Sequence, residues 1–244
     1  MFNRLVIISI TTGLFFMSNP AFSEESPDWQ LHEEKRGVLL YLRDYPNSPI
    51  PEFKAETQIK SSVASVLGVL LHTEACPEWF HQCERATILE AINPHETIVY
   101  QVNKIPFARD RDILFRAKLN FKENGDTILI DISSAEGYCL NNDNEVCADI
   151  NASKHIRVTQ VQGQYRLQKL DDENTKVTWQ QYLDPAGSLP SWVIRSQLDN
   201  LAFNSLKGLR EQATKKDYQS LRLRIENGLL SVIPATPAAV ETPQ

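Results

Sequence analysis

The sequence predicts an α+β fold in which a curved antiparallel sheet packs against one long helix near the C-terminus. Between residues 86 and 183, short segments of β-branched and apolar residues alternate with polar ones, which is typical of strands. Short turns join most of these segments, so neighbouring strands should run antiparallel. Residues 190–214 instead repeat apolar side chains every three or four positions, which indicates an amphipathic helix.

The first 23 residues have the layout of a secretory signal peptide. Arg4 supplies a positive charge, residues 5–17 are mostly apolar, and Ala21 and Ser23 stand at the small-residue positions of a cleavage site. An uncleaved membrane anchor is the alternative, but spanning a bilayer takes roughly 20 apolar residues and this segment is shorter. We therefore expect cleavage after Ser23 and a periplasmic or secreted protein.

Removing residues 1–23 from the 244 leaves a mature chain of moderate length with a mildly acidic balance. The length suits one domain followed by a tail. Acidic and basic residues are mixed throughout, so the chain lacks the basic patch of a nucleic-acid-binding protein and the polybasic cluster that binds anionic membranes. No later stretch approaches spanning length, and we expect a soluble monomer.

The four cysteines form two local pairs, Cys76 with Cys83 and Cys139 with Cys147. In an oxidising compartment such spacings favour disulfide bonds, and the second bridge would close a polar loop. The alternative is metal binding. Neither pair has the Cys-x-x-Cys spacing of a zinc site, and only His72 and His81 lie near the first pair. We expect no metal and no cofactor.

The chain before residue 86 is expected to mix helices and one hairpin. Residues 27–35 are expected to form a short polar helix. Residues 37–45 and 52–60 are predicted strands around a turn at 46–49, with Phe53, Ala55, Thr57 and Ile59 on one face of the second strand. Helical spacing follows in residues 61–71, which Ser61 or Ser62 can cap, and then in residues 77–82.

Strands are expected to dominate the middle of the chain, interrupted by one long polar segment at residues 136–154. The expected strands are 86–92, 97–104, 112–121, 127–133, 155–161, 165–170 and 176–183.

The C-terminal part begins with the long helix, residues 190–214, in which Pro190 suits a first-turn position. Its apolar stripe contains Ile194, Leu198, Leu201, Ala202 and Leu209. Residues 218–232 are expected to add a short helix, and the Pro/Ala/Thr-rich residues 233–244 a disordered tail. The expected organisation is thus a signal peptide (1–23), one domain (24–214) and a C-terminal extension (215–244).

Two segments carry a family resemblance. They are Val-Asn-Lys-Ile-Pro-Phe-Ala-Arg-Asp-Arg-Asp-Ile at residues 102–113 and Thr-Trp-Gln-Gln-Tyr-Leu-Asp-Pro-Ala-Gly-Ser-Leu-Pro-Ser-Trp at residues 178–192. Together they resemble the START lipid-transfer domain, in which an Arg-Asp pair opens a central strand and an Asp-Pro-x-Gly-x-Leu-Pro turn starts the C-terminal helix. The resemblance covers roughly residues 29–213 and implies a helix-grip fold, with the sheet wrapped around the helix and an internal hydrophobic tunnel.

Each motif also has a structural interpretation, which we prefer. In the Asp184–Pro190 turn, Pro185 fixes φ, Gly187 permits a positive φ and Pro190 starts the helix. Arg111 and Asp112 could face a ligand, but we prefer a paired structural role at a strand entrance.

The resemblance implies non-enzymatic binding of a hydrophobic ligand such as a phospholipid, a fatty acyl lipid or a sterol, with transfer as a further step and transient membrane contact. Alternation and helical spacing select the residues expected to line the tunnel. For any one of them, ordinary core packing is the alternative, because periodicity does not distinguish a core from a cavity wall. The candidates are Ile98, Tyr100, Ile113, Phe115, Ala117, Leu119, Ile128, Ile130, Ile194, Leu198, Leu201 and Ser205.

Two further expectations follow from the resemblance. Some family members carry a buried acid–arginine pair that meets the ligand hydroxyl, and its positions fall near Ile98 and Ala117, which are uncharged here. This favours a more apolar cavity, for an acyl lipid rather than a sterol. Residues 136–154 take the place of the family's loop over the tunnel mouth, so a Cys139–Cys147 bridge should stiffen that loop and slow ligand exchange.

An enzyme and a lipid-sensing module are the alternatives, since related helix-grip folds include cyclases and hydrolases and fold alone does not decide function. The sequence contains no Gly-x-Ser-x-Gly, and its five histidines are scattered without metal-binding spacing. Tyr100 and Asp131 could act as acid and base if buried, but no motif marks them. We therefore predict binding without catalysis.

Overall fold

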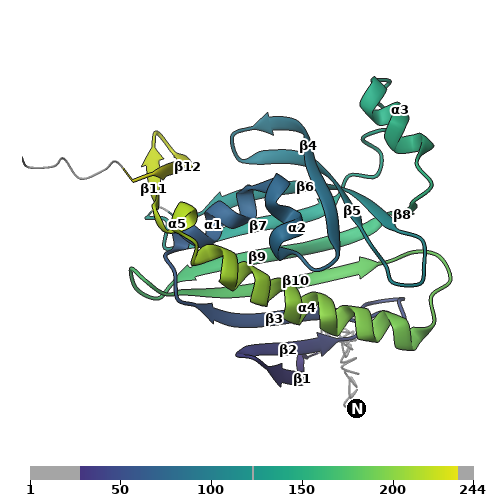
Figure 1. Cartoon of the computed structure of the whole chain (residues 1–244), viewed down its shortest axis with the longest axis horizontal. Helices are drawn as coiled ribbons and strands as arrows, with labels where there is room; N and C mark the ends of the chain where they lie inside the picture. The colour runs from purple at the N-terminus through teal and green to yellow at the C-terminus, as the bar shows by residue number, and fades with distance from the viewer. Residues whose placement is uncertain (1–27, 123, 236–244) are drawn as a thin grey trace, which may run out of the picture.

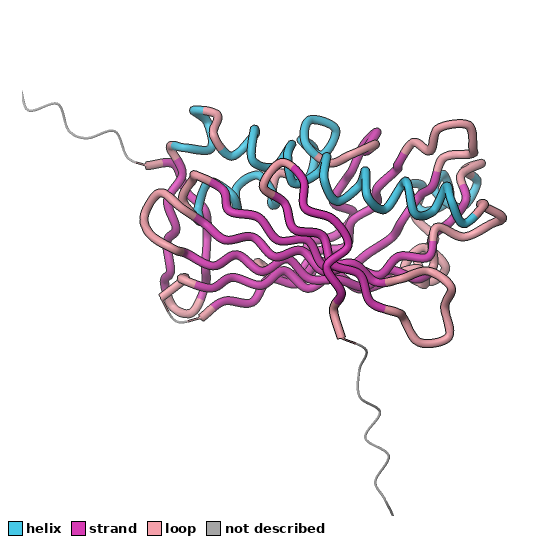
Figure 2. Tube along the Cα trace, turned by 90° about the horizontal axis from the view of Figure 1, so that it is seen from below, coloured by secondary structure: helices cyan, strands magenta, loops and turns pink. Residues whose placement is uncertain are grey.

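The computed structural model describes residues 28–122 and 124–235, so the predicted signal peptide and most of the predicted tail lie outside the described residues. The prediction of an α+β helix-grip fold is confirmed. One large sheet has the strand order β1-β2-β3-β10-β9-β7-β6-β5-β4, with β8 attached to β6. The long helix α4 and the shorter helices α1 and α2 lie on one face of this curved sheet (Figure 1; Figure 2).

The elements mostly match the predicted segments. The helices are α1 (Val63–Leu71), a 3-10 turn η1 (Thr73–Ala75), α2 (Cys76–Trp79), α3 (Glu145–Ala152), α4 (Ser191–Ala213) and α5 (Lys216–Gln219). The strands are β1 (Gln30–Lys35), β2 (Val38–Arg43), β3 (Glu52–Ile59), β4 (Cys83–Asn93), β5 (Glu96–Asn103), β6 (Arg111–Phe121), β7 (Thr127–Ser134), β8 (Ile156–Val158), β9 (Gln160–Lys169), β10 (Thr175–Asp184), β11 (Leu221–Glu226) and β12 (Leu229–Pro234). Among the described helices, none is long and apolar enough to cross a membrane.

The predicted N-terminal helix is wrong. Residues 30–35 form the edge strand β1, which pairs antiparallel with β2 through a tight turn. Arg36 and Gly37 form this turn with φ of 55° and 73°, the left-handed region that reverses a chain in two residues. Leu31 remains 58% exposed, so this strand lies at a solvent-facing edge of the sheet.

The break between the predicted strands 155–161 and 165–170 is also misplaced. A single long strand, β9, runs through residues 162–164, and the real interruption falls at Thr159. Gly163 lies inside β9 because the backbone of β10 approaches it closely: a Cβ there would lie 2.6 Å from the carbonyl oxygen of Gln180. The preceding strand, β8, pairs parallel with β6, which is the exception to the antiparallel pattern.

The C-terminal extension forms a hairpin where a helix was expected. After α5, strands β11 and β12 pair through a turn at Asn227 and Gly228, whose φ values are 52° and 76°. The alternation of Leu221, Leu223 and Ile225 with charged neighbours is a strand pattern, which the helical interpretation overlooked. Residues 233 and 234 belong to β12, so the predicted tail begins too early.

The largest core cluster fills one end of the molecule. There α1, the second half of α4 and the inner face of β3, β9 and β10 pack together, with Trp179, Leu67 and Leu206 fully buried. Ser62 caps α1 by accepting a hydrogen bond from the Ser65 amide at 3.2 Å, as the sequence predicts. Leu230 of the hairpin joins this cluster, so the extension closes this end of the fold.

Candidate ligand-binding cavity

A cavity of about 260 Å³ lies between the first half of α4 and the inner face of the sheet. The apolar residues on its wall come from α1, α2, α4 and the eight strands β3 to β10. They include Phe53, Trp79, Phe80, Ile88, Val99, Ile113, Phe115, Ala117, Ile130, Ile132, Val161, Tyr165, Leu183, Ile194, Leu198 and Leu201. The arrangement is an apolar chamber roofed by a helix, which suits a hydrophobic guest.

Seven of the twelve candidate residues border this cavity. From the strands these are Ile113, Phe115, Ala117 and Ile130, and from α4 they are Ile194, Leu198 and Leu201. Alternation along β6 and helical spacing along α4 therefore selected the correct faces of both elements.

Ile98 and Tyr100 do not border the cavity, because they lie on the opposite face of β5. The pairing register places Val99 opposite Phe115 and Gln101 opposite Ile113, and cross-strand partners point to the same side. Tyr100 instead joins an outer cluster covered by α3. Both faces of β5 are therefore buried, and alternation alone does not indicate which face is the inner one.

Leu119, Ile128 and Ser205 lie beyond the end of the cavity. Leu119 and Ile128 belong to the main core cluster, where neighbouring side chains fill the space. The Ser205 hydroxyl accepts a hydrogen bond from the backbone N–H of His81 at 3.0 Å, which joins α4 to the chain after α2. These three residues are core, the alternative that the sequence left open.

Polar side chains also border the cavity, and the sequence prediction missed them. Gln101 donates to Asn103 at 2.8 Å, and Gln181 accepts from the Trp179 indole at 3.0 Å. Burial lowers the pKa of His81, which favours its neutral form. The side-chain oxygen of Gln197 is buried without a hydrogen-bond partner within the described residues. The wall thus offers several hydrogen-bonding positions in an otherwise apolar chamber.

Arg111 borders the cavity as well and is only 3% exposed. Its guanidinium donates to the carbonyl oxygens of Pro185 at 3.1 Å, Ala186 at 3.2 Å and Arg109. Arg111 therefore holds the turn that precedes α4 against the start of β6.

The family model for the START domain matches residues 20–216 of this chain. The chain belongs to the START domain family. An uncharacterized protein of Pseudomonas aeruginosa is 25% identical over 208 residues, covering 85% of this chain and 96% of the relative. The hairpin β11–β12 lies outside the matched residues.

Two solved structures share the fold of this START domain. A STAR-related lipid transfer protein from Xanthomonas axonopodis matches with a TM-score of 0.64 and 24% identity, covering 77% of this chain and 99% of that one. Human StAR-related lipid transfer protein 5 matches with a TM-score of 0.64 and 16% identity, covering 76% and 86%.

The Asp184–Pro190 turn of this START domain has the predicted geometry at Gly187, whose φ is 70°. Ala186 also has a positive φ of 54°, and its amide donates to the Asp184 side chain at 2.9 Å. Pro190 is the N-cap residue of α4 rather than part of its first turn. The motif sets the direction in which α4 leaves the sheet.

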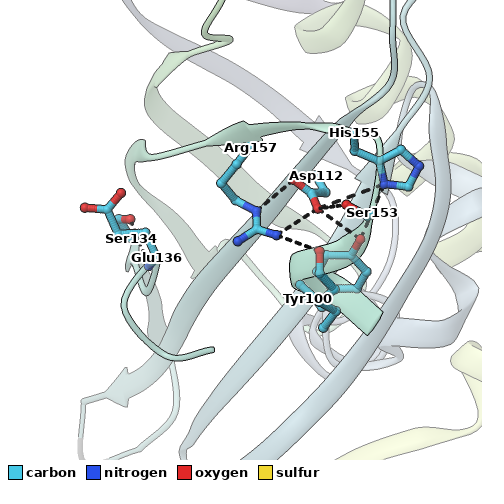
Figure 3. Close-up of polar contacts among 8 residues, drawn as sticks. Tyr100, Asp112, Ser134, Glu136, Ser153, His155 and Arg157 are labelled. Atoms are coloured by element: carbon cyan, nitrogen blue, oxygen red, sulfur yellow. Dashed lines mark hydrogen bonds and ion pairs between the residues drawn. The ribbon is translucent and has the colours of Figure 1, made fainter. Parts of the chain in front are cut away.

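Arg111 and Asp112 each make structural contacts at the start of β6, but with different partners and not with each other. Neighbouring strand residues point to opposite faces, so Arg111 faces inward and Asp112 outward. Asp112 accepts hydrogen bonds from Arg157 at 2.8 and 3.0 Å, from the Tyr100 hydroxyl at 3.1 Å and from Ser153 at 3.2 Å, while His155 Nδ1 lies 4.0 Å away (Figure 3).

This outer cluster keeps Asp112 ionised despite complete burial. Burial alone would raise the pKa of Asp112, but the hydrogen bonds and the positive charge of Arg157 outweigh it, so the pKa lies below its ordinary value. Asp112 and its partners do not border the cavity. Their role is to fasten residues 153–157 to β5 and β6.

The segment 136–154 does not cover the mouth of the cavity, contrary to expectation. Cys139, Cys147 and Ile150 pack against Val102 and Leu114 on the outer face of β5 and β6, and no residue of the segment borders the cavity. Both cysteine pairs, 139 with 147 and 76 with 83, are bonded as disulfides. The segment lies there because apolar residues of α3 cover apolar residues on the outer face of β5 and β6, which would otherwise be exposed to water.

The loop between β5 and β6 stands at the cavity end instead. Its residue Ile105 lines the cavity, and its tip residue Phe107 is fully exposed. Leu189 borders the same cavity just before α4, and Trp192 in the first turn of α4 is 73% exposed. Apolar side chains therefore project into solvent from both segments that bound this end.

Proposed function

We propose that this START domain binds a hydrophobic ligand with a single acyl chain and carries it without chemical change. The mainly apolar cavity between α4 and the sheet is the observation that supports this most directly. Its volume of about 260 Å³ lies just below the roughly 300–1,000 Å³ typical of pockets for drug-sized ligands. That size suits one chain better than the two chains of a phospholipid.

The energetics of burial support the same class of ligand. Each buried methylene contributes roughly 0.8 kcal/mol, so a chain of about ten methylenes gains around 8 kcal/mol before the costs of association. The solved relatives from Xanthomonas axonopodis and human are named as lipid transfer proteins, which supports carriage as the use of this cavity.

Binding without catalysis is supported by where the acid–base candidates lie. Tyr100 donates to Asp112 on the outer side of the sheet. Asp131 accepts from Asn120 at 2.8 Å and from Gln164 at 2.6 Å, and it does not border the cavity. Neither group is positioned to act on a molecule held inside.

Native mass spectrometry of the full chain as purified from cells tests the proposal. We expect an adduct with the mass of a single-chain lipid, recoverable by organic extraction. Ala117→Phe should abolish the adduct because it fills the cavity, while Lys118→Phe, at an exposed position of the same strand, should leave it intact. Absence of any lipid, or equal occupancy in both variants, would count against binding in this cavity. Movement of the lipid between donor and acceptor vesicles then separates a carrier from a sensor.

We also propose export to an oxidising compartment. The signal-peptide pattern of residues 1–23 supports it, and so do the two disulfides, since such bonds persist outside the cytosol. Cell fractionation with the intact mass of the recovered chain tests this, with cleavage after Ser23 as the expected result.

Transient membrane contact is proposed through the exposed Phe107 and Trp192. Both project from segments at the cavity end, where an apolar anchor would bring the opening to the bilayer. Phe107→Ala with Trp192→Ala should reduce co-flotation with neutral lipid vesicles several-fold. Leu140→Ala is the matched control, since Leu140 is 75% exposed on the segment that covers the outer face. An equal loss in the control would contradict a specific contact.

A further inference from the structure

One charged group breaks the apolar character of the cavity. We propose that Arg111 and its neighbours form a site for the anionic head of an amphiphile, a carboxylate or a phosphate, whose chain lies in the apolar part of the cavity. This proposal rests on the proposed function and names the class of ligand within it.

Arg111 carries a buried charge that has no ion-pair partner among the described residues. Arg111 is 3% exposed, and its three acceptors are all neutral backbone carbonyls. Within the described residues, no carboxylate makes an ion pair with Arg111, and its pKa is lowered because burial and the charge of Arg109 outweigh the charge of Asp110. Asp112, the next residue, is instead matched by Arg157. A buried charge without an opposite charge is strongly unfavourable, so an anionic ligand atom at the cavity wall would relieve it.

Arg111 also has N–H donors that its protein partners do not use. A guanidinium has five N–H donors, and the three carbonyls occupy one on each nitrogen. Two donors remain, one on each terminal nitrogen. Two N–H groups of this kind match the two oxygens of a carboxylate or phosphate, and the carbonyls already hold the side chain in place, so little further order is lost on binding.

Two further groups near Arg111 could contact the anionic head of a ligand, namely the side-chain amide of Asn103 and the N-terminus of α4. Asn103 lies directly across the ladder from Arg111, and its side-chain oxygen already accepts from Gln101, which leaves its amide N–H groups to donate. The N-terminus of α4 lies at the same end, since Leu189 and Ile194 on either side of it border the cavity. The N-cap residue of this 23-residue helix, Pro190, makes no side-chain cap hydrogen bond, and the positive end of the helix dipole favours an anion at this end.

The rest of the wall fits the chain of such a ligand. On β6, Arg111 shares the inner face with Ile113, Phe115 and Ala117, all of which border the cavity. This row spans about 20 Å at roughly 3.3 Å per residue. A head held at Arg111 would therefore direct its chain along an apolar track into the chamber.

Competitive displacement of a fluorescent fatty acid from the full chain tests the proposal, with four probes. Hexadecanoate and hexadecyl phosphate should bind at least about tenfold more tightly than hexadecan-1-ol, which is about 1.4 kcal/mol. Inorganic phosphate at millimolar concentration should displace nothing, because it lacks the chain. Equal affinity for the alcohol and the two anions, or tight binding of inorganic phosphate alone, overturns the proposal.

Two variants test whether the preference for anionic ligands over the alcohol depends on Arg111. Arg111→Gln should bring the anion-to-alcohol ratio to within about twofold while alcohol binding persists. Arg116→Gln, an exposed arginine on the same strand, should keep the wild-type ratio. An unchanged ratio in folded Arg111→Gln overturns the proposal, and if that variant does not fold, the wild-type comparison alone decides. Loss of binding for every hexadecyl compound in the wild type would instead contradict the proposed function, which keeps the two failures distinguishable.

Discussion

The two halves of α4 lie over the same sheet but have different surroundings. Along the second half, Ala202, Leu206 and Leu209 are fully buried in the main core cluster. Along the first half, Ile194 and Leu201 border a cavity and are only partly buried. The apolar spacing of the helix is continuous across both halves, so the difference arises from what packs beneath and beside each half.

At the packed end, α1 and the hairpin β11–β12 supply additional apolar side chains. Leu221 of the hairpin packs directly onto Gly68 of α1, and Leu230 enters the core cluster. No comparable element enters the hollow end from inside among the described residues. That end is held from its outer face, by the Asp112 cluster and by the disulfide-bonded segment over β5 and β6. A cavity is thus compatible with a stable fold because the outer covering replaces part of the missing interior contacts.

The largest expected effect tests this outer covering. Arg157→Met leaves the Asp112 carboxylate buried without its cation and should lower the free energy of unfolding by about 3–5 kcal/mol. The pKa of Asp112 is lower in the folded protein than its unfolded value of about 3.9. The carboxylate therefore stabilises the fold fully above that unfolded pKa, and this stabilisation is lost as pH falls through the folded pKa. Urea unfolding at neutral and acidic pH measures both effects. A loss below 1 kcal/mol would show that the cluster does not support the hollow end.

The next prediction contrasts the two halves of α4 directly. Leu206→Ala, at a fully buried position, should cost about 3–4 kcal/mol because the surrounding core leaves a void. Leu201→Ala, on the cavity wall, should cost about 1 kcal/mol in the ligand-free protein, since part of its surface already faces empty space. Chemical denaturation of both variants measures the difference, and equal losses would contradict the distinction between the halves.

The smallest expected effect on ligand exchange, no change at all, concerns the Cys139–Cys147 bridge, whose cysteines are 8 residues apart. Replacing both with Ala should lower stability by about 2 kcal/mol through the loop that the bridge closes. The rate of ligand exchange should not change, because the segment does not border the cavity. Stopped-flow displacement measures this rate. Faster exchange in the double variant would restore the gating role that the sequence resemblance implied.

Much of the fold could be predicted because its signals are local. The strand faces of β3 and β6, the Ser62 cap and both disulfide pairs depend on residues close together in the chain. The failures also have physical reasons. Residues 218–232 carry a strand alternation ending at Asn227-Gly228, which was overlooked, while the edge strand β1 is too exposed to show a buried face.

The candidate site was predictable on β6 because charged residues mark the face of that strand away from the cavity. Asp112, Arg116 and Lys118 alternate there with the cavity-facing residues, although Leu114 on the same outer face is buried. Tyr100 was misplaced because residues of α3 cover the outer face of β5, and Ile98 lies on that same face; no pattern within β5 records that covering.

The sequence by itself determined the family, the α+β class, the local disulfides and the turn that starts α4, since these rest on spacing and turn chemistry within short segments. The tertiary structure alone decided which inward-facing residues form core and which form a cavity wall. It also decided that Arg111 and Asp112 face opposite sides of the sheet with different partners. The physical reason is that a cavity is a space between elements distant in the chain, and its boundaries depend on how those elements pack rather than on the pattern within any one of them.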